Sequence, residues 1–358
     1  MSEGYATFKK GRPDILRRLC LVVAFVAFAA GCSSTPLTPI PTPLHLYVVN
    51  AGQPSGVLQF NLPLTTTTPN FVIASNNPAA VAVDAGGNLA VGNGAGYVQF
   101  FMAPISETSL PSAIFDADAN TPTPFGVNRS VAQMAFTSAG DLWVAAGAYL
   151  GRVNAFTRPF SNASAPSAFV TDASMSAVVS HPFAVGTAFD AAQNLYVADT
   201  EIGTDVTCSS GAGSCSRLLV YAPPYAGAPV TTPDIPVRPT PPPPIVHPFV
   251  ETYRRIAVGA TQLFAAWYPA IPVGGNFGRV DVFNLPITAS STPAFSLVSG
   301  VYNPVAVALD PSGSLYIGNG GGTVTVYSPP ITSASVPSLI FQTAPHGSVA
   351  INDIAVGK

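Results

Sequence analysis

A short apolar segment that begins with Leu recurs six times between residue 44 and residue 358. Neighbouring copies start 43 to 68 residues apart. A period of this size is typical of chains that build one multi-stranded unit per repeat and stack the units on one another. We therefore expect six similar units, whose apolar segments begin at Leu46, Leu89, Leu142, Leu195, Leu263 and Leu315.

Each unit is predicted to hold four strands. A strand of small residues precedes the apolar segment, as at residues 81–84, and a turn rich in Asp, Pro and Gly joins the two. A third strand follows and ends in an aromatic residue, and a fourth segment that opens with Pro, as at residues 111–115, suits an edge strand. A proline breaks the chain between the third and fourth strands of every unit, at Pro63, Pro104, Pro159, Pro224, Pro286 and Pro329.

The composition agrees with a fold made of many short strands. The 358 residues include 37 Pro and 31 Gly, which interrupt long helices, while 48% of residues are hydrophobic, so a large core can form. Six four-stranded units arranged radially describe an all-β fold, the six-bladed β-propeller. The first unit lacks a small-residue strand, and residues 352–357 match the one at residues 303–308. We expect this C-terminal strand to complete the first blade, which leaves no open edge.

Two turn-plus-strand segments carry a resemblance to a known family. Residues 190–199 (DAAQNLYVAD) and 310–317 (DPSGSLYI) resemble the blades of NHL-repeat proteins. The resemblance extends over nearly all of residues 44–358. It implies a propeller and no particular activity, because one fold serves many functions.

The N-terminus predicts export. Five Lys and Arg residues lie within residues 1–18, and a 12-residue apolar run follows at residues 19–30, which is the pattern of a secretory signal. The run is shorter than the roughly 20 residues that span a membrane as a helix. The Ala-Ala-Gly-Cys that follows resembles the bacterial lipoprotein box, whose cysteine, here Cys32, would be lipidated. Ordinary signal cleavage beside an incidental cysteine is the alternative.

These features divide the chain into three parts. Residues 1–31 are predicted to be a lipoprotein signal peptide, residues 32–43 a tether rich in Ser, Thr and Pro, and residues 44–358 the propeller, with a Pro-rich insertion at residues 223–248. The predicted location is the bacterial cell envelope, outside the cytoplasm, with a lipid anchor in a membrane. We interpret the insertion as a stiff surface loop, and the alternative is a ligand for an aromatic groove.

Two cysteines, Cys208 and Cys215, remain in the predicted propeller. An oxidising compartment and the Gly- and Ser-rich segment between them predict a disulfide, with a metal-binding or redox pair of thiols as the alternative. The exported part has 9 basic and 15 acidic residues. It offers no basic surface to a phosphate backbone, so we exclude nucleic acid as a partner. We expect a monomer.

Candidate site residues lie where the innermost strands begin, because those connections ring the mouth of a propeller's central channel. Repeat alignment makes the three asparagines of this set equivalent, and gives their place to Ser and Arg in two other blades. Imidazole and amide groups there could bind a polar ligand or a metal ion, and the alternative is that they cap turns and lie apart. The set comprises Asn77, Ser130, His181, His247, Arg254, Asn303, His346 and Asn352.

Carboxylates are sparse in the predicted propeller. Asp199, Glu201 and Asp205 form a dense group, but their spacing lacks the ligand pattern of a calcium loop, and we interpret the segment as a solvated hairpin tip. The remaining glutamates are Glu107 and Glu251, and repeat alignment places no glutamate on an innermost strand. Propeller lactonases of the gluconolactonase type hold a divalent ion in the central channel with Glu, Asn and Asp, so a direct transfer of that site is not favoured.

The sequence contains no G-x-S-x-G, H-E-x-x-H, Walker or G-x-G-x-x-G motif. It therefore favours a membrane-tethered binding or scaffold module that needs no cofactor and whose ligand is a protein, peptide or glycan. The alternative is a propeller hydrolase or lyase that resembles lactonases or streptogramin lyases, with a polar or divalent-metal site at the central channel.

Overall fold

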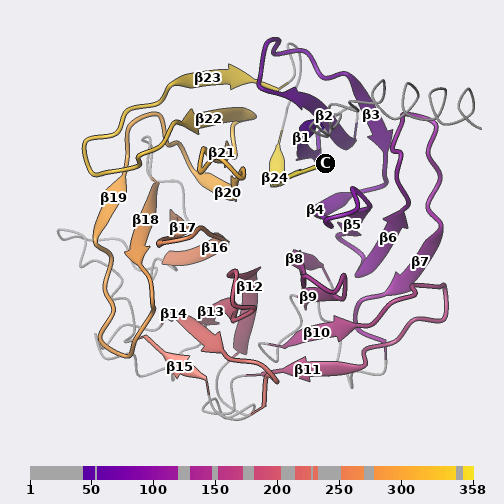
Figure 1. Cartoon of the computed structure of the whole chain (residues 1–358), viewed down its shortest axis with the longest axis horizontal. Coiled ribbons are helices and arrows are strands. Elements are labelled where there is room, and N and C mark those ends of the chain that lie inside the picture. Colours follow the sequence, from indigo (N-terminus) through magenta and orange to yellow (C-terminus); the bar gives the residue numbers. More distant parts are fainter. Residues whose placement is uncertain are drawn as a thin grey trace, which may run out of the picture. The chain divides into compact units, whose positions relative to one another are not determined.

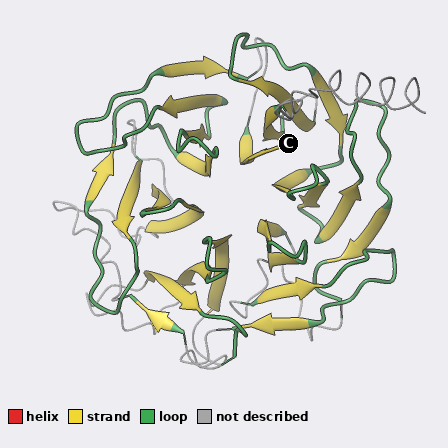
Figure 2. Cartoon of the chain, in the orientation of Figure 1, coloured by secondary structure: helices red, strands yellow, loops and turns green. Residues whose placement is uncertain are grey.

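The computed structural model describes residues 43–52, 55–119, 130–146, 152–171, 181–202, 214–226, 229–232, 251–269, 278–343 and 350–358. This part of the chain consists of strands and loops and holds no helix (Figure 2). Accordingly, none of the described residues forms an apolar helix of membrane-spanning length. The predicted signal peptide and residues 32–42 of the predicted tether lie outside the described residues, and so do Cys32, Cys208, His247 and His346.

The described strands form six antiparallel sheets of four strands each. The first blade contains β24 (Ile351–Gly357), β1 (Leu44–Asn50), β2 (Gly56–Leu62) and β3 (Phe71–Ala74). The second contains β4 (Pro78–Val83), β5 (Leu89–Asn93), β6 (Tyr97–Phe101) and β7 (Ala113–Asp116), and the third contains β8 (Val131–Phe136), β9 (Leu142–Ala146), β10 (Val153–Phe156) and β11 (Ala168–Val170). The fourth contains β12 (His181–Phe189), β13 (Leu195–Ile202), β14 (Ser214–Tyr221) and β15 (Val230–Thr231). The fifth contains β16 (Glu251–Val258), β17 (Gln262–Pro269), β18 (Arg279–Asn284) and β19 (Phe295–Leu297), and the sixth contains β20 (Pro304–Leu309), β21 (Leu315–Asn319), β22 (Thr323–Tyr327) and β23 (Leu339–Gln342).

The blades follow one another around a central axis, with β24, β4, β8, β12, β16 and β20 innermost (Figure 1). Each innermost strand contacts the innermost strand of the next blade, including β20 with β24 and β24 with β4. The six-bladed β-propeller predicted from the repeat is confirmed.

The C-terminal strand closes the ring. β24 pairs antiparallel with β1, so that Ile354 lies opposite Val48. Ile354 is buried and packs, together with the half-buried Val356, against residues of the first and sixth blades. The predicted completion of the first blade by the C-terminus is therefore confirmed.

The alignment predicted within this strand is wrong by two residues. Ile351, not Asp353, takes the place of Pro304 at the start of the innermost strand, because Ile351 pairs with Asn50 as Pro304 pairs with Asn319. Asn352 therefore lies two positions further along its strand than Asn303, the residue with which the repeat alignment matched it.

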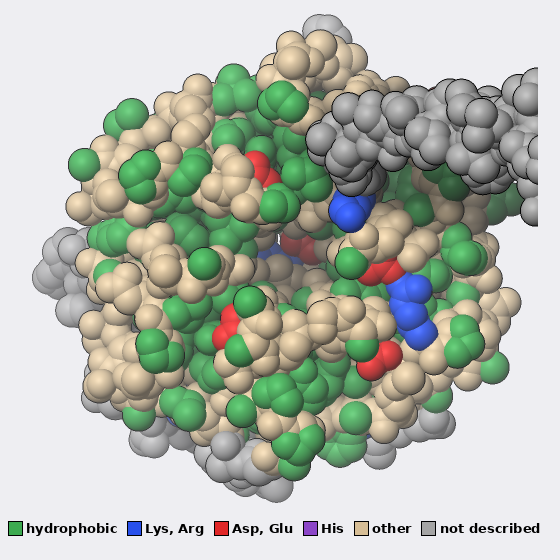
Figure 3. Space-filling view, viewed as in Figure 1, with side chains coloured by type: hydrophobic (Ala, Val, Ile, Leu, Met, Phe, Trp, Pro, Cys, Tyr) green, Lys and Arg blue, Asp and Glu red, His purple; other side chains and the backbone are tan. Residues whose placement is uncertain are grey.

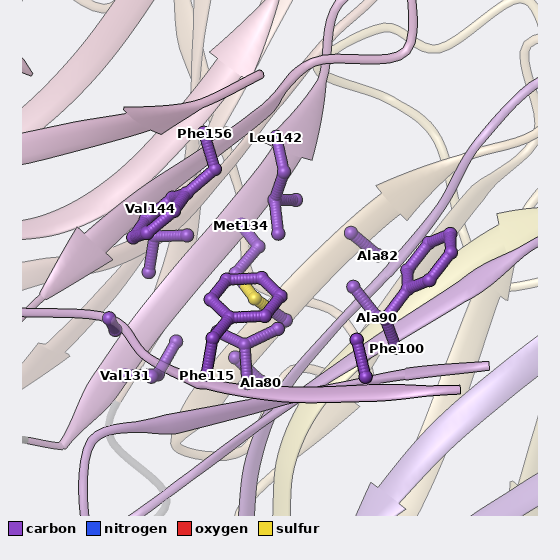
Figure 4. Packing of buried hydrophobic residues seen from close by; sticks show 13 residues of the cluster. Ala80, Ala82, Ala90, Phe100, Phe115, Val131, Met134, Leu142, Val144 and Phe156 are labelled. Atoms are coloured by element: carbon purple, nitrogen blue, oxygen red, sulfur yellow. The ribbon is translucent and has the colours of Figure 1, made fainter. Parts of the chain in front are cut away.

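An apolar layer fills each of the six interfaces between neighbouring blades. Between the second and third blades, Phe100 and Phe115 face Met134 and Phe156 (Figure 4). Phe160, which follows the proline break of the third blade, packs on this layer with its ring centroid 4.8 Å from that of Phe100. Burial of each such side chain contributes about 1.5–3 kcal/mol, so the interfaces between blades hold the ring together.

In the second, fourth and sixth blades, the turn after the innermost strand uses Asp, as the sequence predicted. Asp84 Oδ1 accepts hydrogen bonds from the backbone N–H groups of Gly86 and Asn88, both at 2.8 Å. Asp190 and Asp310 accept the N–H group four residues on in the same way. Asp84, whose side chain is 6% exposed, also forms an ion pair with Arg158, whose side chain is 35% exposed, so this partly exposed pair joins the second blade to the third.

The Pro-rich insertion begins later than predicted. β15 lies within residues 223–248 and pairs with β14 as the outermost strand of the fourth blade. Directly after β15, Thr232 Oγ1 accepts a hydrogen bond from the backbone N–H of Leu218 at 3.0 Å. The start of this segment is therefore part of a blade, because it supplies the fourth strand of its sheet, and residues 233–250 lie outside the described residues.

Candidate functional site

Each innermost strand carries one extra residue at the same height. In five blades the pairing with the second strand skips one residue of the innermost strand, as between Pro78 and Ala80. In the fifth blade it skips Arg254 and Arg255 opposite Ala266 alone, which again leaves one extra residue on the innermost strand. A β-bulge of this kind leaves backbone groups without a partner in the ladder. We call these six residues the bulge ring: Ala79, Ala132, Val185, Arg254, Val305 and Asn352.

The next residue of each innermost strand alternates in character around the ring. The first, third and fifth blades have a large polar side chain, whereas the second, fourth and sixth have Ala or Gly. Small residues between the large ones leave room at the axis: a Cβ atom on Gly186 would lie 3.2 Å from Oε1 of Gln133. We call this set the axial layer, which in blade order is Asp353, Ala80, Gln133, Gly186, Arg255 and Ala306.

The guanidinium group of Arg255 binds backbone carbonyls of the bulge ring. Nη1 donates to the carbonyl oxygens of Val185 at 3.0 Å and Arg254 at 3.1 Å. Nη2 donates to those of Ala79 and Asn352, each at 3.4 Å. One side chain thus contacts the first, second, fourth and fifth blades.

The carboxylate of Asp353 completes the surroundings of Arg255. Arg255 Nε lies 3.4 Å from Asp353 Oδ1, and the backbone N–H of Val81 donates to Asp353 Oδ2 at 3.0 Å. Nη1 and Nη2 of Arg255 thus bind four backbone carbonyls, whereas the N–H group at Nε lies beside Asp353 Oδ1 without forming a hydrogen bond, so this contact is an ion pair.

Gln133 forms hydrogen bonds with backbone groups on the opposite side of the axis. Its Oε1 accepts hydrogen bonds from the backbone N–H groups of Thr187 at 2.9 Å and Ile256 at 3.2 Å, and its Nε2 donates to the carbonyl of Ile256 at 3.0 Å. The three polar side chains therefore satisfy backbone groups that the bulges release from the ladders.

Burial dominates the electrostatics of this layer. Asp353 is 0% exposed and Arg255 8%. Loss of hydration raises the pKa of Asp353 to about 6, although Arg255 and the N–H groups of Val81 and Ile354 act in the opposite direction. Loss of hydration also lowers the pKa of Arg255, which the charge of Asp353 counteracts. The hollow at the centre of the propeller in Figure 3 has acidic and basic side chains at its bottom, as a charged axial layer requires.

The structure divides the predicted asparagines between two roles. Asn77 and Asn303 have left-handed backbones, with φ of 51° and 50°, and their carbonyls accept hydrogen bonds from Gly94 and Gly320, each at 2.9 Å. This geometry matches the turn-forming alternative stated above. The side chain of Asn77 is exposed, and that of Asn303 is half-buried.

Asn352 and Arg254 belong to the bulge ring instead. Asn352 Nδ2 donates to the carbonyl of Pro78 at 3.0 Å, which ties the first blade to the second beside Asn77. The structure therefore brings Asn352 and Asn77 to one place, whereas the predicted equivalence of Asn352 and Arg254 with Asn303 is wrong by two residues. Ser130 is half-buried and directly precedes β8.

His181 is the first residue of β12, so it lies at the start of an innermost strand. Two predictions about single carboxylate residues are wrong. Glu251 begins β16, so a glutamate does lie on an innermost strand. Asp199 is 1% exposed, and therefore does not belong to a solvated hairpin tip, because β13 continues as far as Ile202. Of the predicted disulfide, the structure describes only the backbone of Cys215, in β14.

Sequence reasoning missed Gln133, Arg255 and Asp353. A signal was present, because an alanine lies two residues after the axial layer in every blade. Alignment on these alanines would have placed three polar residues where the other blades have Ala or Gly. The alanines are Ala82, Ala135, Ala188, Ala257, Ala308 and Ala355.

A second buried polar cluster lies within the fifth blade. Asp281, which is 0% exposed, accepts hydrogen bonds from Tyr253 at 2.9 Å, Arg279 at 2.7 Å and Ser296 at 2.6 Å. Burial raises the pKa of Tyr253 well above its ordinary value. The guanidinium carbon of Arg279 lies 4.1 Å from the ring centroid of Trp267. These partners satisfy Asp281, so the cluster holds β16, β17, β18 and β19 together.

Within the described part of the chain, no three His, Cys, Asp or Glu side chains gather closely enough to hold a metal ion. The carboxylate at the axis, Asp353, faces Arg255. The described residues of the axis therefore do not fit the divalent-metal form of the alternative prediction.

Comparisons with known proteins support the architecture. No family model matches the sequence, and no curated protein matches it. Among solved structures, a protein from Lactobacillus plantarum has a TM-score of 0.56 and 14% identity, over 88% of this chain and 99% of that one. The periplasmic gluconolactonase of Pseudomonas aeruginosa has a TM-score of 0.54 and 12% identity, over 88% and 99%. A protein of unknown function from Bacteroides caccae has a TM-score of 0.51 and 11% identity, over 88% and 100%. Likeness at these identities shows the fold alone.

Proposed function

We propose that this chain is a binding or scaffold propeller, held in the bacterial cell envelope by a lipid on Cys32. The observation that supports the proposal is that the polar side chains of the axial layer bind other groups of the propeller. Arg255, Asp353 and Gln133 direct their polar atoms to backbone groups or to one another, so they stabilise the ring and present no reactive group.

Residues at the start of the innermost strands remain for ligand binding. Asn77 is exposed beside the bulge ring, and Asn352 lies next to it through the carbonyl of Pro78. Amide groups of this kind both donate and accept hydrogen bonds, which suits the polar groups of a peptide, a protein loop or a glycan. We place the binding surface at this end of the axis, and expect a monomeric module without a resident cofactor.

A lactone hydrolase is the second candidate, favoured by the likeness in fold to a periplasmic gluconolactonase. It predicts a catalytic centre at the axis, where the only described carboxylate of the axial layer, Asp353, is paired with Arg255. Binding without turnover therefore agrees better with the side chains.

Two assays on the lipidated full-length protein distinguish the candidates. Sedimentation with purified cell-wall glycan and with solubilised envelope proteins measures binding. Hydrolysis of glucono-δ-lactone, with and without added divalent ions, measures turnover. We expect saturable binding that Asn77→Gly, which keeps the left-handed backbone of this position, weakens without lowering the Tm, and hydrolysis at the spontaneous rate. Metal-dependent hydrolysis that exceeds the spontaneous rate would contradict the proposal and support the lactone hydrolase.

A further inference from the structure

The axis of the propeller contains the kind of donor set that binds cations. Four carbonyl oxygens of the bulge ring and one carboxylate oxygen of Asp353 lie 3.0 to 3.4 Å from nitrogen atoms of Arg255. Carbonyl and carboxylate oxygens converging on one point are the ligands that hard cations take in proteins. Here the positive group at that point is a side chain of the protein itself.

We propose that the bulge ring and Asp353 form a cation site at the axis, and that the guanidinium group of Arg255 is its resident cation. The site accepts a planar guanidinium group, and in the absence of Arg255 it takes free guanidinium.

The repeated bulges explain why the site forms at the axis. Each bulge releases a carbonyl from the ladder of an innermost strand, and the six innermost strands surround one axis. Such carbonyls are costly to bury unless they accept hydrogen bonds. A single guanidinium group satisfies four of them from four blades, which no neutral side chain of that size can do, because only Arg has five donors in one plane.

The alternation of the axial layer explains how the cation fits. Arg255 shares its layer with two other polar side chains, and the three remaining positions are Ala80, Gly186 and Ala306. Ala80 and Ala306 are both 0% exposed. Small residues in alternate blades give the guanidinium group room on the axis, and Asp353 compensates its charge.

This site does not depend on the proposed binding function. It couples the closing strand β24 to β16 through Asp353 and Asn352. Arg255 thus connects the last strand of the chain to the fifth blade across the axis.

Chemical rescue tests the proposal. Arg255→Ala removes the cation and leaves Asp353 and four carbonyls buried without it, so we expect the Tm to fall by about 10 °C. Millimolar guanidinium chloride, far below denaturing concentrations, should raise the Tm of this variant, and sodium chloride at the same ionic strength should not. Arg158→Ala is the matched control, because it also removes an arginine from an ion pair with a buried aspartate, but this arginine is 35% exposed. Its Tm should not respond to guanidinium.

A second pair of variants covers the case in which Arg255→Ala does not fold. Arg255→Lys keeps a cation and Arg255→Met keeps a similar length without charge, so the yield of soluble monomer should be higher for Lys than for Met. Equal yields for the two, or a Met variant as stable as the parent protein, would overturn the proposal. So would an equal response of Arg255→Ala to guanidinium and to sodium chloride.

Discussion

Val48 and Ile354 are opposite one another in an antiparallel pair, although they lie near the two ends of the repeat region. Val48 is 0% exposed and Ile354 is 3% exposed, and both belong to the apolar layer between the sixth and first blades. A buried contact therefore joins β24 to β1, and the stability of the ring depends on β24.

Replacing Ile354 in β24 by a smaller residue should destabilise the whole propeller. Ile354→Ala removes buried methyl groups and leaves a cavity, so we expect a loss of about 2–5 kcal/mol in the free energy of unfolding. Urea denaturation followed by circular dichroism measures it. The matched control is Ile340→Ala in β23, where the residue is 47% exposed, and it should change stability by less than about 0.5 kcal/mol.

Deletion of residues 350–358 is the stronger form of the same test. It removes β24, exposes the ladder groups of β1 and leaves Arg255 without Asp353. We expect aggregated or unfolded protein in size-exclusion chromatography. A truncated protein that stays monomeric with an unchanged Tm would show that β24 is dispensable.

The repeat was enough to predict the blades, because four strands per unit leave a pattern of apolar, turn and proline residues that survives in the sequence. The axial layer could not be predicted in the same way. Gln133, Arg255 and Asp353 come from three separate blades, and their side chains meet only after the ring has closed. The bulges add a further difficulty, because the extra residue in each innermost strand is invisible to an alignment that assumes regular pairing.

For the asparagines, the sequence predicted the position but not the backbone conformation. Their place at the start of the innermost strands was predicted, but the difference between a turn residue and a bulge residue depends on the backbone. Asn303 adopts a left-handed conformation, whereas Asn352 is an extra residue within a strand. Both are asparagine followed closely by an apolar strand, so the sequence alone does not separate them.

The titration of Asp353 should make the free energy of unfolding depend on pH. Its pKa rises from 3.8 to about 6 on folding, so the folded protein binds this proton more tightly than the unfolded chain does. The resulting stabilisation is complete below about pH 4 and is lost as the pH rises toward about 6. One pKa unit corresponds to about 1.4 kcal/mol, so the loss is on the order of 3 kcal/mol.

Comparison with Asp353→Asn isolates this group. Arg255 faces Asp353 directly, and the charge of Arg254 acts on Arg255. Urea denaturation from pH 4 to pH 7 should show the parent protein losing stability relative to the variant between about pH 4 and pH 6. Parallel curves for the two proteins would exclude the raised pKa.

Membrane retention should depend on Cys32. We expect Cys32→Ala to prevent lipidation, since a thiol is required for the thioether to the lipid, and to release the propeller from the membrane fraction. Fractionation followed by immunoblotting measures the distribution. Cys20→Ala, within the apolar run of the predicted signal peptide, is the control and should leave the distribution unchanged.

The cysteines of the fourth blade should be oxidised in the exported protein. We expect Cys208 and Cys215 to form a disulfide, because the compartment is oxidising and the segment between them is rich in Gly and Ser. Mass spectrometry of the non-reduced protein after alkylation measures the free thiols. Alkylation of both cysteines without prior reduction would rule out the bond.

Because Asn303 has a left-handed backbone, two substitutions at this position can distinguish a structural role from a role in ligand binding. With φ at 50°, this position suits Gly and Asn but is strained for a β-branched residue, so Asn303→Val should cost about 1–2 kcal/mol of stability. Asn303→Gly keeps the left-handed turn and the carbonyl that accepts the N–H of Gly320, and should leave the Tm nearly unchanged. If Asn303 serves only the turn, the Gly variant binds ligand as well as the parent protein does. If its amide contacts the ligand, the Gly variant loses affinity at full stability. The binding assay and the thermal melt on this one variant therefore assign the role of a residue that the sequence identified as a candidate and the structure identifies as part of a turn.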